Sequence, residues 1–342
     1  MLAPGFRRRD EDLKLILSRN VKRTVRAVLA LGIVTWLAYR IGVSTVLDHI
    51  ARADVALLFA ATLALAADGV LKAWNWQQLL DATVHDQSVR FLRVLRWHFA
   101  GGFLGAIVPS SASTDACRVY LGQKGLGGHA LTCAASVVTV NGLGWFTGCA
   151  LGIVGMGLLS LHSELPRLLG PAAVLFLFTL AVLPLLYALL AAKREALLSA
   201  VDRIAHRWPG LRKSIGKFVD ALLVFEQAHV RFPTFLGIST LGLLAQSGMY
   251  ALTAAAVGVD LPFGVWMVLA PLTRIVALIP ISIADLGLIQ AAHVSVLTLF
   301  DVPPAQSFAI STLFALQGLL VHATLGSTAF VWSSRAGKVA TG

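Results

Sequence analysis

Long apolar runs alternate with short polar or basic segments along the chain. A helix needs about 20 apolar residues to cross the hydrocarbon core of a bilayer, and about six runs reach that length. They lie at roughly 25–43, 55–80, 129–158, 168–192, 235–257 and 307–332. The pattern predicts an all-α polytopic membrane protein with about six full transmembrane helices.

Basic residues give these spans an orientation. They concentrate before residue 25, at 90–96, at 193–231 and after residue 332. The positive-inside rule places these four segments, and therefore both termini, in the cytoplasm. The base-poor segments 44–54, 159–167 and 258–263 should then face outward.

This orientation constrains two shorter apolar segments. Segment 97–128 begins and ends inside, whereas segment 264–304 begins and ends outside. We therefore predict two re-entrant, broken-helix hairpins that enter the membrane from opposite faces. If either segment crosses completely, the other must cross too, or the C-terminus moves outside.

The chain is thus expected to fall into five parts. The part between the two membrane halves repeats apolar residues at helical spacing among many bases, which fits two amphipathic helices on an anionic membrane surface. A solvated helical hairpin packed on the spans is the alternative. The predicted parts are a basic N-terminus (1–24), a first membrane half (25–192), the amphipathic helices (193–233), a second membrane half (234–333) and a tail (334–342).

Composition supports membrane insertion and narrows the function. The chain is 57% hydrophobic and 13% charged, whereas soluble domains carry about 25% charged residues. The net charge of +11 lies beside the spans, so it indicates orientation rather than nucleic-acid binding. Three cysteines show no disulfide pattern. No metal-ligand spacing and no phosphate-binding or dinucleotide motif is present, so we expect neither metal nor cofactor.

The two predicted hairpins contain similar sequences. "AIVPSSASTD" and "ALIPISIAD" each combine two aliphatic residues, a proline, a serine two residues later and an aspartate. Pro109 then corresponds to Pro280, Ser111 to Ser282 and Asp115 to Asp285. Together with the opposite orientations, this similarity predicts an inverted repeat, an arrangement that places a substrate site near the bilayer midplane.

Four charges next to these prolines are costly in a membrane. A charge at the bilayer centre costs about 2.5–3.5 kcal/mol on insertion scales. We expect Asp115, Arg118, Arg274 and Asp285 to meet in one buried polar site, where the arginines bind phosphate. A helix N-terminus after each break would add affinity for an anion. The alternative is that the prolines only kink helices and the charges lie at headgroup level.

Other polar side chains interrupt the spans. Asp68 and Lys72 share a helix face, and either they line a site or Lys72 snorkels to the cytoplasmic side. Gln246 and Tyr250 also share a face, and either they line a cavity or they serve packing. Asn141, among glycines, is expected mainly in helix packing and is a further candidate. His98, His293 and His322 show no zinc spacing and are expected to be ordinary hydrogen-bonded or interfacial residues. Tryptophans near span ends, Trp36, Trp74, Trp76 and Trp97, are expected to form an aromatic belt.

The two interrupted motifs resemble a known family. "GAIVPSSASTDACRVYL" and "LTRIVALIPISIADLGLIQ" are similar to the two motifs of the transmembrane region of lysylphosphatidylglycerol synthases, a family that includes flippase-like and hopanoid-associated proteins. The motif positions retained are Pro109, Asp115, Arg118, Arg274, Pro280, Ser282 and Gly287. Thr114, Ala284 and Asp285 replace motif glycines, and Gln290 replaces the usual glutamate. The soluble aminoacyl-transfer domain of full-length synthases is not expected in this chain.

The resemblance and the residues together predict a lipid transporter or flippase-like protein of the bacterial inner membrane. Its expected cargo is a polar or phosphate-bearing lipid, with terpenoid, hopanoid and glycolipid types as candidates, and a lipid-modifying enzyme is a candidate partner. The alternatives are an integral membrane glycosyltransferase acting on a lipid-linked sugar, and a scaffold for a lipid-modifying complex. The expected substrate-binding residues are Pro109, Ser110, Ser111, Asp115, Arg118, Arg274, Pro280, Ser282, Asp285 and Gln290.

Overall fold

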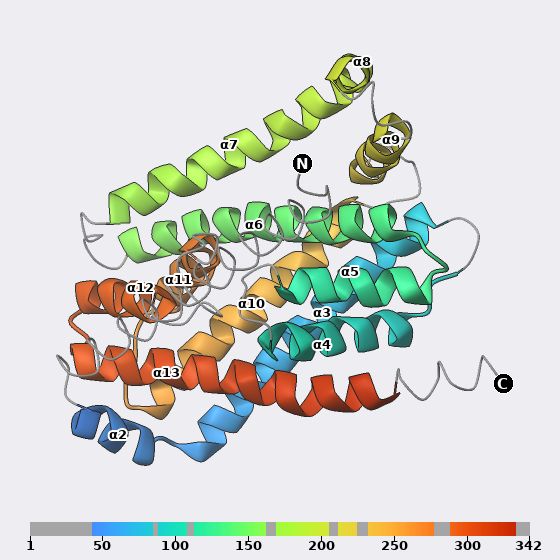
Figure 1. Cartoon of the computed structure of the whole chain (residues 1–342). Coiled ribbons are helices and arrows are strands. Elements are labelled where there is room, and N and C mark those ends of the chain that lie inside the picture. Colours follow the sequence, from blue (N-terminus) through green and yellow to red (C-terminus); the bar gives the residue numbers. More distant parts are fainter. Residues whose placement is uncertain are drawn as a thin grey trace, which may run out of the picture.

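The computed structural model describes residues 43–84, 88–107, 113–161, 169–204, 211–223, 232–276 and 288–332, and this part of the chain forms helices joined by short loops (Figure 1). The all-α prediction is therefore confirmed for the residues described. The helices are α2 (Val43–Ala51), α3 (Val55–Thr83), α4 (Phe91–Ile107), α5 (Ser113–Gly125), α6 (Ala130–Ser160), α7 (Gly170–Ala192), α8 (Arg194–Ile204), α9 (Leu211–Leu222), α10 (Phe232–Ala256), α11 (Phe263–Val276), α12 (Leu288–Leu297), η3 (Thr298–Phe300), α13 (Pro304–Val321) and η4 (His322–Gly326).

Among the described residues, five helices are long and apolar enough to cross a membrane: α3, α6, α7, α10 and the helix Pro304–Trp332 that contains α13. They coincide with five of the predicted spans, and the remaining predicted span at 25–43 lies outside the described residues. Large apolar side chains cover the outside of α7, among them Val174, Leu177 and Phe178. Exposed apolar surface of this extent is stable in lipid but not in water. The protein is an integral membrane protein.

The same order of helices occurs twice. A long helix, two short helices and a second long helix follow one another as α3 to α6 and again as α10 to α13. The short pair α4 and α5 lies at one end of the bundle, and the pair α11 and α12 lies at the opposite end (Figure 1). The motif prolines lie between the two helices of each pair, in residues 108–112 and 277–287, which are outside the described part.

Glycines bring the backbones of these helices together. Gly101 and Gly105 lie one turn apart on α4, and a Cβ atom on Gly105 would come within 2.4 Å of the Thr114 Cα on α5. Gly155 of α6 and Gly264 of α11 approach each other so closely that a Cβ on either would lie 2.7 Å from the other's carbonyl oxygen. Small residues at four-residue spacing favour such packing in membranes, where helices cannot gain hydrophobic energy from lipid.

Two tryptophans differ from their expected positions. Trp76 and Trp97 are buried and pack against each other, with ring centroids 6.3 Å apart. The Trp76 indole also donates a hydrogen bond to Ser136 Oγ at 2.9 Å. The aromatic-belt prediction is wrong for these two residues, because the hairpin α4–α5 covers the end of α3 that the sequence left open to lipid. Trp74 is exposed, whereas Trp36 lies outside the described residues.

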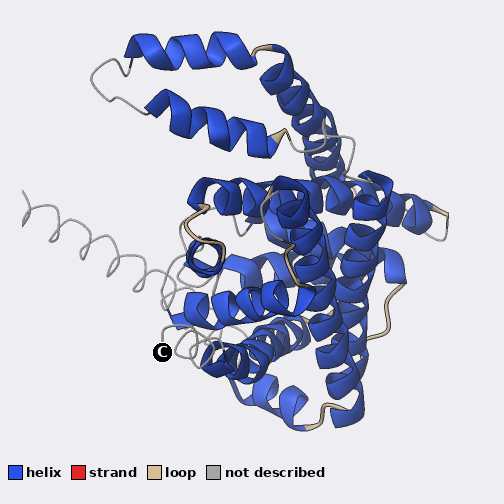
Figure 2. Ribbon diagram, turned by 90° about the vertical axis from the view of Figure 1, so that its right-hand side faces the viewer, coloured by secondary structure: helices blue, strands red, loops and turns tan. Residues whose placement is uncertain are grey.

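The polar region after α7 forms two helices, α8 and α9, that project from the bundle (Figure 2). Arg194 joins them, since its Nε donates to Asp220 Oδ1 at 2.8 Å. The hydrogen bond and charge of Asp220 raise the pKa of Arg194. Leu198 and Val219 are buried, and α9 packs on α6. The placement of these helices on an anionic membrane surface stays a prediction.

Candidate functional site

The first motif lies where α5 begins. Ser113, the first residue of α5, donates a hydrogen bond from its Oγ to the Gly105 carbonyl oxygen of α4 at 2.8 Å. This bond joins the start of α5 to α4. It places Asp115 in the first turn of α5, where a carboxylate is stabilised by the positive end of the helix dipole.

Asp115 connects two other side chains. Its Oδ1 accepts from Arg118 Nη1 at 3.1 Å, and its Oδ2 accepts from Asn141 Nδ2 at 2.7 Å. Asn141 is on α6, so this carboxylate links the short hairpin to a long helix. The packing role expected for Asn141 is therefore accompanied by direct polar contact with the motif.

Arg118 has a second partner that the sequence did not indicate. Its Nη2 lies 3.3 Å from the ring Nε2 of His98, and its Nε donates to the His98 carbonyl oxygen at 3.5 Å. His98 is on α4, twenty residues earlier in the chain. All three nitrogens of the guanidinium thus have a partner on α4 or α5.

The second motif contributes Arg274, in the last turn of α11. Both Nε and Nη2 of Arg274 donate to Gln246 Oε1 on α10, with the Nε bond at 3.1 Å. Gln246 in turn donates to Tyr250 Oη at 3.4 Å, and that hydroxyl lies 3.3 Å from Thr273 Oγ1. The predicted pair Gln246 and Tyr250 therefore orients the motif arginine.

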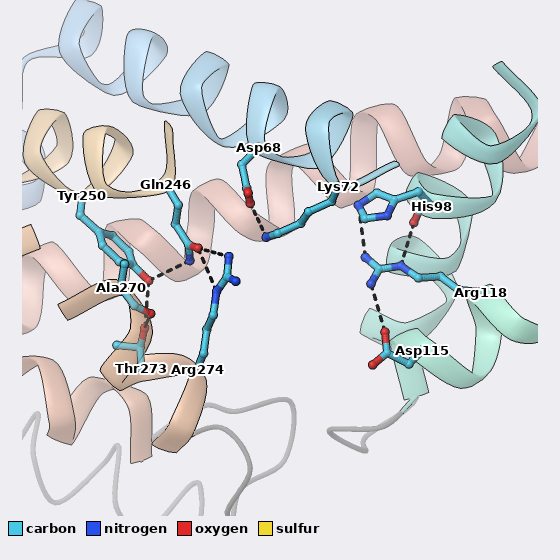
Figure 3. Close-up of polar contacts among 10 residues, drawn as sticks. All are labelled: Asp68, Lys72, His98, Asp115, Arg118, Gln246, Tyr250, Ala270, Thr273 and Arg274. Carbon is cyan, nitrogen blue, oxygen red and sulfur yellow. Dashed lines mark hydrogen bonds and ion pairs between the residues drawn. The ribbon is translucent and has the colours of Figure 1, made fainter. Parts of the chain in front are cut away.

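Asp68 and Lys72 of α3 lie between the two motifs (Figure 3). They form an ion pair, and Asp68 is only 2% exposed. The charges of Arg274 and Arg118 both act on Lys72. The structure therefore brings the arginines of the two motifs into one charged cluster, and Lys72 connects them.

The cluster is electrostatically unbalanced in the part of the chain described. It combines two carboxylates with three cations, and Arg274 has only the neutral Gln246 as its hydrogen-bond acceptor there. The Nη1 atom of Arg274 faces Gly144 of α6, where a Cβ would lie 3.3 Å away. One Asp68 oxygen has no hydrogen-bond partner among the described residues. Unsatisfied buried charge of this kind favours a polar ligand.

Two further histidines lie near the cluster. His322 begins a π-helical turn, His322–Gly326, and its ring contacts the backbone of α4 at Gly102. Turns of this type occur often at functional sites. His293 of α12 is 1% exposed and packs against Tyr250 and Phe314, and neither of its ring nitrogens has a partner among the described residues. The expectation of a hydrogen-bonded or interfacial side chain is wrong for His293.

Several predicted site residues lie outside the described part of the chain: Pro109, Ser110, Ser111, Pro280, Ser282 and Asp285. Gln290 is described, and it is buried in α12 at 5% exposure. Within the ranges described, no three histidine, cysteine or acidic side chains are grouped to hold a metal ion.

These observations define a class of protein: an integral membrane helical bundle with a charged cluster between two oppositely placed pairs of short helices. The family follows from comparison with known sequences. The chain belongs to the family described as the lysylphosphatidylglycerol synthase TM region, whose model matches residues 23–326. The predicted resemblance is confirmed. No curated protein matches the chain.

Proposed function

We propose that the protein is a flippase-like lipid transporter that moves lipids with a phosphate-bearing or otherwise anionic headgroup across the bacterial inner membrane. The observation that carries this proposal is the charged cluster of Lys72, Arg118 and Arg274. These cations come from three helices and exceed the carboxylates described around them. Family membership connects the chain with a lipid-related membrane region.

The physical argument concerns the cost of the cluster. Ionisable residues within membrane helices are expensive, and they persist mainly where they face a bundle interior or a polar pathway. Asp68, Asp115 and Gln246 reduce that cost but leave a positive excess in the described region. An anionic headgroup would neutralise the excess, while its acyl chains stay in the surrounding lipid.

The arrangement of helices supports a transport mechanism. In the proposed topology, α4–α5 and α11–α12 are re-entrant hairpins of an inverted repeat that approach the cluster from opposite faces. Alternating exposure of such a site to the two sides moves a ligand without a nucleotide site. The basic start of α4 and the helices α8 and α9 share one end of the bundle, which agrees with cytoplasmic termini.

Reconstitution in liposomes tests this function. The full chain is inserted into vesicles with fluorescent phosphatidylglycerol or phosphatidylcholine, and translocation is followed by chemical quenching of the outer leaflet. Removing Arg118 or Arg274 with alanine deletes charge-assisted hydrogen bonds of about 1.5–3 kcal/mol, so we expect translocation to fall by about tenfold to a hundredfold.

Arg93→Ala is the matched control. Arg93 is exposed on α4, and its replacement removes the same charge outside the cluster. Wild-type protein that translocates neither lipid, or cluster variants that retain the wild-type rate, would contradict the proposal. Incorporation of a sugar from a lipid-linked donor by the same vesicles would favour the glycosyltransferase alternative.

A further inference from the structure

His98 holds Arg118 in a manner that depends on protonation. The buried imidazole provides Nε2 at 3.3 Å from Arg118 Nη2, and its backbone carbonyl accepts from Arg118 Nε. Arginine has five N–H donors and no acceptor. The Nε2 atom must therefore be the acceptor, which requires a neutral imidazole with its proton on Nδ1.

Protonation removes this contact. An imidazolium has no free lone pair, because both nitrogens carry protons. It would also place a new positive charge beside Arg118 and Lys72, two cations whose charges already act on His98. The guanidinium would then leave the ring, and its Nη2 would be free to bind another acceptor.

The groups facing His98 come from each helix packed against α4. They are Lys72, ion-paired with Asp68 on α3, Arg118, ion-paired with Asp115 on α5, and His322 at the π-helical turn after α13. No carboxylate contacts the His98 ring among the residues described. Addition of a proton here is thus compensated only if Arg118 moves away or an anion enters.

We propose that His98 is a proton-binding and positioning residue: it holds Arg118 in the absence of lipid, and its protonation releases Arg118 to bind the phosphate of an anionic lipid headgroup. This inference rests on the proposed function, which it deepens by linking lipid binding to a proton. One proton from solvent bonds to Nε2 when the lipid binds, and it returns to solvent when the lipid leaves. Linkage is reciprocal, so acidification strengthens lipid binding.

Proton uptake on binding is the direct test. Dioctanoylphosphatidylglycerol is titrated calorimetrically into the purified full chain at pH 7, in buffers of different ionisation enthalpy. The wild type should take up as much as about one proton for each lipid bound, since one histidine gains a proton when the bound anion offsets the cations beside it. In His98→Gln the uptake should fall to near zero, because glutamine still offers Arg118 an acceptor oxygen but binds no proton.

His293→Gln is the matched control, since it removes another buried histidine that has no contact with Arg118, and it should keep the wild-type uptake. Equal uptake by wild type and His98→Gln would overturn the proposal. Inorganic phosphate serves as the second probe. If phosphate binding takes up a proton but lipid binding does not, His98 keeps its proton-binding role, and the proposal that the bound phosphate belongs to a lipid is overturned.

A measurement without ligand separates this inference from the proposed function. Nitrogen NMR of histidine-labelled protein, with the His98 signal assigned by its loss in His98→Gln, should show the neutral Nδ1–H form at pH 8. The signal should change when Arg118 is replaced by alanine. An Nε2–H or protonated His98 at that pH would overturn the link to Arg118 even in a protein that transports lipid. If His98 gives the neutral Nδ1–H signal but the protein binds no lipid, only the proposed function is contradicted, and the contact between His98 and Arg118 stands.

Discussion

Individual charges in this bundle are stabilised by partners from other helices. Asp115 is shared between Arg118 and Asn141, and Arg274 depends on Gln246. Hydrogen bonds to charged groups contribute about 1.5–3 kcal/mol each, and the loss of one partner leaves the other desolvated. At the residue scale, neutral amides therefore matter as much as the opposite charges, because they position a cation without cancelling it.

Gln246→Glu tests this distinction. The carboxylate would accept from Arg274 with nearly unchanged geometry but would neutralise the positive excess of the cluster. We expect translocation of phosphatidylglycerol to fall by about tenfold or more while thermal stability is retained. The measurement is the vesicle assay together with thermal unfolding in detergent.

Gln123→Glu is the control, because it adds the same charge near the end of α5, away from the cluster. Unchanged translocation by Gln246→Glu would show that the uncancelled charge of Arg274 is not needed.

The short helices depend on close backbone contact. On α4, Gly101 faces the Arg118 backbone and Gly105 faces Thr114, so α5 can lie directly against α4. This contact sets the distance between His98 and Arg118. At the scale of elements, the glycine spacing of "GGFLG" thus determines the geometry of the charged cluster.

Gly105→Ala should separate the two helices. Its Cβ would lie 2.3 Å from Thr114 Oγ1 and 2.4 Å from the Thr114 Cα, and backbone atoms cannot rotate away. Overpacking of this kind costs about 1–3 kcal/mol. We expect a lower midpoint of thermal unfolding and slower translocation.

In the control Gly237→Ala on α10, no atom lies within 4 Å of the added methyl group. The same change there should be neutral or stabilising by as much as about 1 kcal/mol, because alanine favours a helix. Equal unfolding midpoints in the two variants would show that the α4–α5 contact is not tight.

Across the whole molecule, the ends of the described helices gather at two ends of the bundle. The start of α4, the end of α5 and the α8–α9 pair gather at one end, and the end of α6, the start of α7 and the start of α11 lie at the other (Figure 1). Only the first group is rich in bases in the sequence. The charge asymmetry and the three-dimensional arrangement therefore agree on two distinct membrane faces.

Cysteine labelling tests this topology. Ser160 and Ser199 are exposed and lie on either side of α7, and Ser→Cys is nearly isosteric. In a background with Cys117, Cys133 and Cys149 replaced by serine or alanine, we expect a membrane-impermeant maleimide added outside cells to label Cys at 160 only. Label at 199 should require permeabilised membranes. Labelling of both sites from outside would contradict a membrane-spanning α7.

The sequence alone determined the helical class, the five spans that the structure describes and the family, and it singled out Arg118 and Arg274 as motif residues. Apolar length and basic asymmetry are local properties, so they can be read without a fold. Asp68, Lys72, Asn141, Gln246 and Tyr250 were found as candidates because a polar residue inside an apolar run is costly wherever it points.

Only the tertiary structure decided which of these residues meet. His98 lies twenty residues before Arg118, and Gln246 lies twenty-eight before Arg274, so no periodicity connects them. Burial of Trp76 and Trp97 likewise depends on where α4 and α5 fold back. Such contacts are set by helix packing between distant segments, which fixes the balance of charge at the centre of the bundle in a way that composition cannot.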